Sequence, residues 1–460
     1  MTTPDLVVRG GLLALPDGIV PGTLVVDGGR IAAVLPDGVA VPETREVLDA
    51  DGAVVSAGVV DLHVHFDVPG IDLADDFRVG TASAAIGGVT FVVEHPFSDP
   101  PTTTTDRYAA KARTAAERAH VDFGLWGALT APSLDHMRGQ WELGASGFKA
   151  FLPDNDMGFP PATPEDLRAG MTTAAALGAR VLVHAEDRAA LADGASRMRE
   201  AGRSDVGAFL DVRPPETEVR AVAHVLDVAR ATGAAVHLVH LSTPASVDLV
   251  AAAVTDGVAA TCEVAAHHLL LTDEDLRAQG GIALCAPPLR STAEVDAMWE
   301  RVADGRIDAI VSDHCPCEPG VKQAAGDDAL AGPYGIQGVQ EYVALVLSEG
   351  LRRGVALDLL LDRLTARPAA LCGVADRKGA LRPGLDADLV VLRLDRPWTV
   401  DAAAQQYGEL RWSPYDGFRP TVRVERTVVR GRTVAVDGAL VAAPGTGSFV
   451  PLSRQEVARG

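Results

Sequence analysis

The feature that most constrains the fold is an alternation of short apolar segments with amphipathic segments between about residues 55 and 380. Near-continuous apolar runs are typical of parallel strands that are buried on both faces. The segments between them are rich in Ala, Leu, Arg and Glu, as in Glu216–Ala231. Eight strands alternating with helices predict a (β/α)8 barrel, an α/β fold. The predicted strands are Val59–His65, Val89–His95, Val121–Leu129, Gly147–Leu152, Arg180–Ala185, Ala235–Leu241, Val258–Val264 and Ile307–Asp313.

Both ends of the chain show a different pattern. Leu6–Val34 contains β-rich runs separated by Asp-Gly and Gly-Gly pairs, which are hairpin signals, and it lacks helical periodicity. Similar runs return in Asp388–Leu392 and Thr421–Val436. We therefore expect a small β-sandwich domain built from residues 1–54 plus 381–445, a barrel over residues 55–380 and a C-terminal tail over residues 446–460.

Composition excludes several classes of partner. The formal net charge is −21, and nucleic acids and anionic membranes both require basic surfaces. No apolar run is long enough for a transmembrane helix, and Met1–Asp5 lacks the start of a signal peptide. The five cysteines are odd in number and scattered, which indicates reduced thiols and a cytoplasmic location.

Polar residues gather where the predicted strands end. Catalytic groups of such barrels lie at the carboxyl ends of the strands. His63 and His65 share one face of the first strand, because alternate side chains of a strand point the same way, and two imidazoles suit a divalent metal. The same rim receives Lys149, His184, His240 and Asp313.

Each of these residues also has a structural interpretation. A single histidine at a strand end is often a hydrogen-bonded core residue, and Asp313 alone could cap a helix. Lys149 lies between Phe148 and Phe151, and a lysine in apolar surroundings is costly unless it is neutral or paired. Four histidines, a lysine and an aspartate on one rim favour a metal site. By alternation, His237 and His314 are predicted to point away from it.

This set of residues resembles the amidohydrolase superfamily, and within it the cyclic amidohydrolases: hydantoinase, dihydropyrimidinase, allantoinase and dihydroorotase. The resemblance implies two divalent metal ions, expected to be zinc, bridged by a Lys149 that CO2 has carboxylated. His63, His65 and Asp313 are then expected to hold one ion, and His184 and His240 the other. It also implies that a metal-bound hydroxide attacks a ring amide carbonyl, with Asp313 as the catalytic acid–base group.

Residues near the predicted rim help to predict which ring the protein hydrolyses. Asp67 stands where dihydroorotases carry an arginine, and Asp154 where dihydropyrimidinases and D-hydantoinases carry a tyrosine. The stretches Ser312–Cys317 and Cys285–Arg290 resemble allantoinases, whereas Pro96-Phe97 resembles L-hydantoinases. We expect hydrolysis of a small neutral cyclic ureide or imide, allantoinase-like first, then hydantoinase or dihydropyrimidinase, then dihydroorotase.

The resemblance also implies substrate contacts and an assembly state. The expected substrate-binding residues are His267, Ala286, Asp67, Gly335 and Gln337. The expected assembly is a homotetramer or homodimer. Two alternatives remain: a non-catalytic paralogue that keeps the fold, or a deacetylase or aryl-dialkyl hydrolase from elsewhere in the superfamily.

Overall fold

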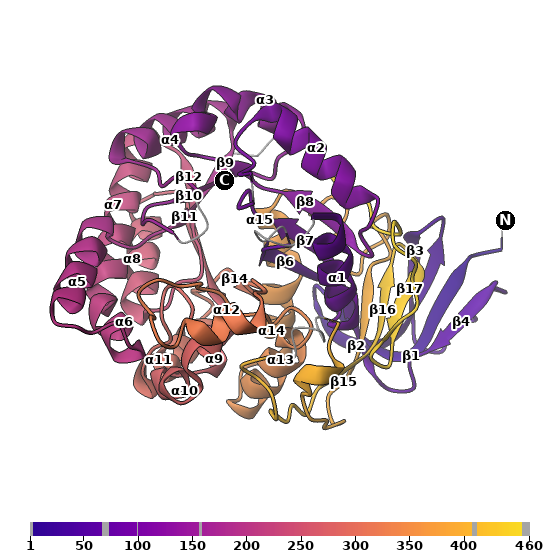
Figure 1. Ribbon diagram of the computed structural model, residues 1–460. Coiled ribbons are helices and arrows are strands. Elements are labelled where there is room, and N and C mark those ends of the chain that lie inside the picture. Colours follow the sequence, from indigo (N-terminus) through magenta and orange to yellow (C-terminus); the bar gives the residue numbers. More distant parts are fainter. Residues whose placement is uncertain (1–2, 67–72, 99, 156–158, 407–411, 453–460) are drawn as a thin grey trace.

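The computed structural model describes residues 3–66, 73–98, 100–155, 159–406 and 412–452. A ring of β/α units encloses the centre of the molecule, and strands from both ends of the chain form a sheet at one side of it (Figure 1). The predicted α/β barrel fold is confirmed.

The barrel strands are parallel, and each overlaps a predicted strand. They form a sheet in the order β14-β13-β12-β11-β10-β9 and a second sheet β6-β7-β8, and a bridge between Val64 and His314 joins the two. The third strand is interrupted at Trp126, whose indole nitrogen donates to the carbonyl of Leu62 at 2.9 Å. The barrel strands are β6 (Val59–Val64), β7 (Val89–Glu94), β8 (Asp122–Leu125), β9 (Gly127–Ala128), β10 (Phe148–Phe151), β11 (Arg180–His184), β12 (Ala235–Leu238), β13 (Ala260–Ala265) and β14 (Ala309–Val311).

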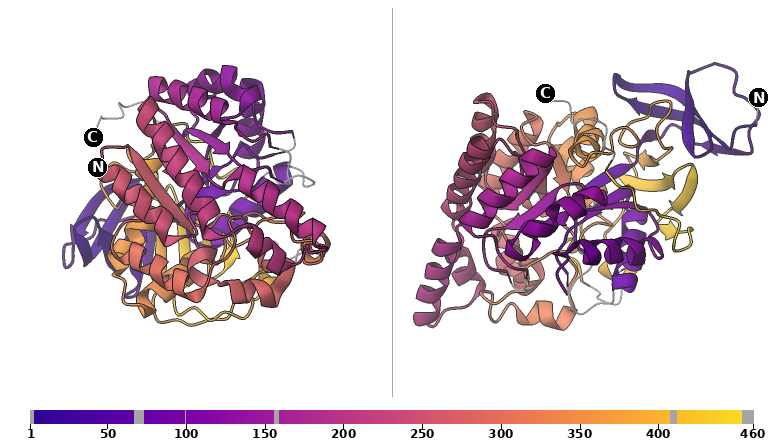
Figure 2. Two further views of the ribbon diagram at one scale, coloured as in Figure 1. Left: turned by 90° about the vertical axis from the view of Figure 1, so that its left-hand side faces the viewer. Right: turned by 90° about the horizontal axis from the view of Figure 1, so that it is seen from above.

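Helices cover the outside of the barrel (Figure 2). Several begin at reciprocal capping boxes, such as those of Thr163 with Asp166 and Ser291 with Glu294, which satisfy the free amide groups of the first turn. In chain order the helices are α1 (Leu73–Ile86), α2 (Thr105–Ala116), η1 (Ala131–His136), α3 (Met137–Glu142), α4 (Pro164–Leu177), α5 (Arg188–Glu200), α6 (Val206–Val212), α7 (Pro215–Thr232), α8 (Pro244–Thr255), α9 (His267–Leu270), α10 (Asp273–Gln279), η2 (Gly280–Ala283), α11 (Thr292–Ala303), α12 (Pro319–Ala324), α13 (Tyr342–Arg352), α14 (Leu357–Leu364), α15 (Ala366–Leu371) and η3 (Ala402–Ala404).

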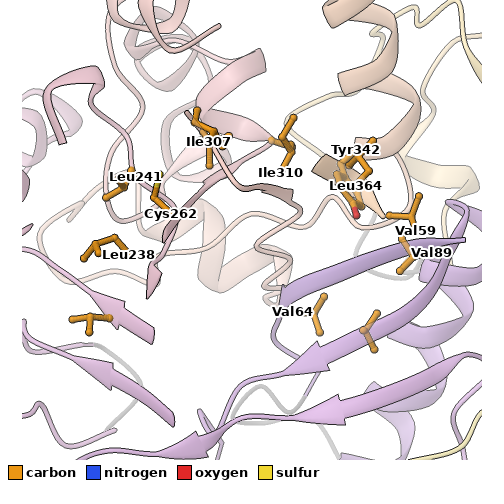
Figure 3. Close-up of a cluster of buried hydrophobic side chains, with 14 of the residues drawn as sticks. Val59, Val64, Val89, Leu238, Leu241, Cys262, Ile307, Ile310, Tyr342 and Leu364 are labelled. Carbon is orange, nitrogen blue, oxygen red and sulfur yellow. The ribbon is translucent and has the colours of Figure 1, made fainter. Parts of the chain in front are cut away.

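Two hydrophobic layers hold the barrel. The outer layer lies between strands and helices, where Val59 and Val89 belong to the same buried cluster as Tyr342 and Leu364 (Figure 3). The inner layer fills the barrel with side chains such as Leu62, Phe91 and Trp126. Because this packing closes the centre of the barrel, polar side chains can gather only at its rims.

The terminal strands form one nine-stranded sheet, in the order β18-β17-β16-β15-β5-β1-β2-β3 with β4 beside β1. N- and C-terminal halves meet where β5 pairs with β15. The sheet contains β1 (Leu6–Leu15), β2 (Gly18–Asp27), β3 (Arg30–Pro36), β4 (Glu46–Asp49), β5 (Val54–Ala57), β15 (Leu389–Arg393), β16 (Arg423–Val429), β17 (Arg432–Val436) and β18 (Ala439–Leu440). The predicted domain boundaries, residues 1–54 plus 381–445, stay predictions.

The start of the predicted tail runs back to the barrel. Phe449 forms a parallel bridge with Phe123 of β8, and the amide of Val450 donates to the carbonyl of Phe123 at 2.8 Å. Within the described parts of the chain, no helix is both long and apolar enough to cross a membrane.

Candidate active site

The end of β6 and the turn after β14 bring three predicted metal ligands together. His63 Nε2 lies 3.2 Å from Asp313 Oδ1, and His65 Nε2 lies 3.7 Å from the same oxygen. Ligand atoms of these three residues lie within 4.8 Å of one another. His63 and His65 are buried, whereas Asp313 is partly open. A cluster with two imidazoles and one carboxylate has the chemistry of a divalent metal site.

The predicted ligands at the end of β11 and just after β12 form an adjacent pair. The rings of His184 and His240 lie 4.6 Å apart between centroids, and that of His240 lies 5.2 Å from His63. His240 follows the end of β12 in a left-handed conformation, with φ of 38°, and Asp313 follows β14 with φ of 47°. Such backbone is costly for residues other than glycine and often occurs at functional sites. Nδ1 of His240 is buried and has no hydrogen-bond partner within the described parts of the chain.

Lys149 lies on β10 and is fully buried. Its Nζ has no hydrogen-bond partner among the described residues and lies 4.7 Å from the centroid of the Phe151 ring. Burial lowers the pKa of Lys149 to about 7, because the charged amine loses its hydration. At neutral pH a large share of this amine is therefore uncharged and nucleophilic.

Two buried glutamates, to which the sequence analysis gave no role, orient predicted ligands. Glu263 on β13 contacts His63 Nδ1 at 2.5 Å and His237 Nε2 at 3.0 Å. Burial raises the pKa of Glu263 to about 8. Because the carboxyl group of Glu263 contacts Nδ1 of His63, Nε2 is left to face Asp313. His237 therefore points at Glu263 instead of the site. The signal in the sequence was a charged residue inside an apolar strand.

Glu186 orients His184 in the same way as Glu263 orients His63. Its carboxylate accepts from His184 Nε2 at 2.8 Å and from Arg213 Nη1 at 2.6 Å. Burial alone raises the pKa of Glu186, but the Arg213 charge and the His184 hydrogen bond lower it to about 2. Since Nε2 of His184 is occupied, Nδ1 is the nitrogen that remains for a metal.

A pocket opens over these residues. Five of the six predicted metal-binding residues line it: His63, His65, His184, His240 and Asp313. Phe97 and Phe151 form one wall, with ring centroids 5.2 Å apart. The pocket also reaches Cys285, Cys315, Arg213 and Tyr334.

The predicted substrate-binding residues fall into three groups. Ala286 and Gly335 line the pocket. Among the described residues, His267 and Gln337 are buried outside its lining, although His267 Nε2 lies 4.0 Å from Asp313 Oδ2. Asp67 lies outside the described residues. His314 points away, as predicted, since its Nδ1 accepts from the amides of Gly338 and Val339 at 2.9 and 3.3 Å.

Comparison with known proteins agrees with this geometry. The model of the amidohydrolase family matches residues 54–434, more than four-fifths of the chain. The chain belongs to the amidohydrolase family. Within the family it is 39% identical to an allantoinase of Rubrobacter xylanophilus and 32% identical to an L-hydantoinase of Paenarthrobacter aurescens, with at least 99% of each chain covered. The solved structure of L-hydantoinase (dihydropyrimidinase) from Arthrobacter aurescens superimposes with a TM-score of 0.93 at 32% identity, covering 98% of this chain and all of that one. The expected family is confirmed.

Proposed function

We propose that this protein is a binuclear metal-dependent hydrolase that opens the ring of a neutral cyclic ureide, with allantoin as the preferred type of substrate. The observation that carries the proposal is the convergence of four histidines, Lys149 and Asp313 at one rim of the barrel. Similarity to allantoinases over nearly the whole chain supports the choice of ring.

The residues at the rim fit two zinc ions. His63, His65 and Asp313 are the ligands proposed for one ion, and His184 and His240 those for the other. A carboxylated Lys149 is proposed to bridge them, since its amine has no hydrogen-bond partner among the described residues and a large share of it is neutral near pH 7, which suits reaction with CO2. Bound metal ions lower the pKa of a coordinated water and polarise the amide carbonyl.

The chain's own residues supply proton transfer and positioning. Asp313 takes a proton from the attacking water through a carboxylate oxygen and delivers it to the ring nitrogen as the C–N bond breaks. Water is thereby added across one amide bond of the ring, which yields a carboxylate and leaves the released nitrogen as the NH2 of a ureido group. Ala286 and Gly335 line the pocket, and their backbone groups are the proposed contacts of the ring's imide edge. Phe97 and Phe151, which form one wall, are proposed to shield the site from bulk water.

Hydantoin hydrolysis is the second candidate. Two observations favour it: the similarity to L-hydantoinases and the aromatic wall of Phe97 and Phe151, which suits a bulky apolar substituent at the ring carbon. We further propose a cytoplasmic homotetramer or homodimer, which light scattering of the purified protein would test.

Ring-opening assays separate the two candidates. The protein is supplied with zinc or manganese and bicarbonate and offered allantoin, 5-benzylhydantoin, dihydrouracil and dihydroorotate. We expect kcat/KM for allantoin to exceed the others at least tenfold, and Asp313→Asn to abolish turnover while the protein stays folded. A tenfold preference for the benzyl compound would instead assign a hydantoinase. Absence of turnover with every ring, with metals bound, would overturn the proposal.

A further inference from the structure

His267, His268 and Cys285 form a second group of potential metal ligands, separate from those at the rim. His267 and His268 begin α9, directly after β13, and Cys285 lies two residues after η2. Ligand atoms of the three residues, one from each, lie within 4.8 Å of one another. All three residues are buried, and Cys285 is a free thiol. The proposed reaction gives this group no role as metal ligands.

The two imidazoles of this group have nitrogens without partners. Both ring nitrogens of His267 and Nδ1 of His268 are buried and have no hydrogen-bond partner among the described residues. Burial lowers the pKa of both histidines, that of His268 to about 4, so each ring is neutral and keeps one nitrogen with a free lone pair. Histidines that only pack in a core are normally hydrogen-bonded, because an unpaired buried nitrogen carries a desolvation cost. These nitrogens therefore point to a ligand.

One carbonyl group holds His268 and Cys285 close together. His268 Nε2 lies 3.1 Å from the carbonyl oxygen of Pro287, and the thiol of Cys285 donates to the same oxygen at 3.3 Å. The ring of His267 lies 4.4 Å from that of His268 between centroids. Ligands of a tetrahedral zinc ion lie about 3.3–3.6 Å apart, so donors within 4.8 Å of one another have to contract only slightly around an ion.

The donor set selects the kind of cation. Two imidazoles and one thiolate suit zinc or cadmium, whereas magnesium, calcium and manganese prefer carboxylate and carbonyl oxygens. Cys285 also lines the substrate pocket, which gives an ion a route from solvent. Burial raises the pKa of the Cys285 thiol to about 12, so the sulfur keeps its proton until a metal ion replaces it.

We infer that His267, His268 and Cys285 bind one soft divalent cation of the zinc or cadmium type, and that this ion inhibits ring opening. On binding, one lone pair from the sulfur and one from each imidazole form bonds to the ion, and the thiol proton passes to water. The site then carries a net charge of +1.

The expected inhibition follows from the position of Asp313. Its Oδ2 lies 4.0 Å from His267 Nε2, whereas its Oδ1 faces His63 and His65. An ion bound beside His267 attracts Oδ2 as a further ligand and competes for the carboxylate that is proposed to transfer the proton. The inhibition therefore rests on the proposed function, but binding of the ion does not.

The test titrates zinc-loaded protein with cadmium and measures binding separately from turnover. Thiolate-bound cadmium absorbs in the ultraviolet, whereas the ligands proposed for the two zinc ions include no sulfur. Mass spectrometry counts zinc and cadmium per chain and shows whether cadmium replaces zinc. Cys285→Ser removes the thiolate, and His268→Gln removes an imidazole but keeps a donor for Pro287. Cys315→Ser is the matched control, because it removes another buried thiol of the same pocket.

We expect the wild type to bind one cadmium ion per chain beyond its zinc, with the thiolate absorption. Cys285→Ser should lose this absorption and bind cadmium at least tenfold more weakly, His268→Gln should also bind more weakly, and Cys315→Ser should match the wild type. Cadmium should slow allantoin ring opening by the wild type. Half-inhibition of Cys285→Ser, relative to its own cadmium-free rate, should need at least tenfold more cadmium.

Two results overturn the metal site: no thiolate absorption in the wild type, or absorption that survives in Cys285→Ser. Loss of the absorption in Cys315→Ser alone would place the cadmium elsewhere and overturns the site as well. Cadmium uptake without any slowing of turnover overturns the inhibition. If Cys285→Ser does not fold, the comparison of His268→Gln with the wild type decides. A wild type that opens no ring would overturn the proposed function and the inhibition with it, while cadmium uptake still decides on the site.

Discussion

Two buried clusters of charged and polar side chains, one around Lys149 and one around Lys378, differ in how completely they are paired. In the first, Lys149 Nζ and buried nitrogens of His240 and His267 have no hydrogen-bond partner among the residues that the structure describes. In the second, Lys378 Nζ donates to Asp388 at 2.5 Å, to Asp122 at 2.8 Å and to Asp386 at 3.3 Å.

Every carboxylate of the second cluster is paired with a cation. Besides Lys378, Arg430 Nη1 lies 2.9 Å from Asp122, and Arg377 Nη2 lies 2.8 Å from Asp386. Arg30, which is more exposed, adds a longer contact of 3.8 Å to Asp386. Burial alone lowers the pKa of Lys378, but Asp388 and Asp122 raise it above its usual value. This cluster ties the start of barrel strand β8 to the segment that leads into β15 and the terminal sheet.

The two clusters occupy opposite ends of the barrel strands. Asp122 begins β8, whereas His63, His184 and Asp313 lie at or just beyond the carboxyl ends of their strands. In barrels of this type the carboxyl ends carry chemistry and the amino ends carry stability. Lys378, whose ammonium group is fully paired with carboxylates, therefore stabilises the fold. Lys149, whose amine lacks a hydrogen bond among the described residues, is instead available for reaction.

The largest expected effect is that of Lys149→Met on activity. Without the bridging group we expect metal content to fall below one ion per chain and kcat/KM to fall about a thousandfold or more. The metal-free variant should melt at the same or a higher temperature than the metal-free wild type, because burial of an unpartnered amine is costly. Metal analysis, ring-opening assays and calorimetry check this. Full metal occupancy in the variant would contradict the bridging role.

The same substitution at Lys378 should act in the opposite way. Lys378→Met leaves three carboxylates without their central cation, and breaking a buried ion pair typically costs about 3–5 kcal/mol. We expect the free energy of unfolding in urea to drop by about that amount, with activity per folded molecule and metal content unchanged. Unchanged stability would show that the charge network does not hold the sheet to the barrel.

The sequence predicted one cluster and missed the other for a physical reason. The alternation of strands and helices placed His63, Lys149, His240 and Asp313 at one rim, because strand direction alone decides which ends converge. An ion pair between residues that are far apart in the sequence leaves no such local pattern. Lys378 meets Asp122, 256 residues away, only after the barrel closes.

The contacts of the rim residues with their buried neighbours could not be predicted either. Glu263 stands out in the sequence as a charged residue in an apolar strand, but its contact with His63 joins residues that are 200 positions apart. The interruption of the third strand at Trp126 depends on packing inside the barrel, so the sequence predicted a single strand there.

Glu263→Gln tests whether the contacts around the first cluster matter for metal binding, because it changes a neighbour of His63 and removes no predicted ligand. The two oxygens of Glu263 contact different rings, Oε1 that of His63 and Oε2 that of His237, whereas an amide has only one oxygen and places an NH2 group against the other ring. Loss of such an outer partner typically weakens metal binding about 10–100-fold. Competition with a zinc chelator measures this. Glu341→Gln is the control, because that buried acid is hydrogen-bonded to Ser413 and Gln405 and, among the described residues, to no histidine. Equal zinc affinity in both variants would contradict an orienting role for Glu263.

The smallest expected effect is a difference in how stability depends on pH. In metal-free, bicarbonate-free protein, the pKa of Lys149 is about 7, whereas in the unfolded chain it returns to about 10.5. Between these values the unfolded state binds more protons, so the free energy of unfolding rises with pH by up to about 1.4 kcal/mol per pH unit from this group. Below pH 7 both states are protonated and the contribution is constant. Lys149→Met should remove this slope, so that its advantage over the wild type in urea unfolding shrinks steadily from pH 7.5 to 9.5. Parallel curves for the two proteins would mean that Lys149 is charged in the folded state, and that the first cluster is paired like the second.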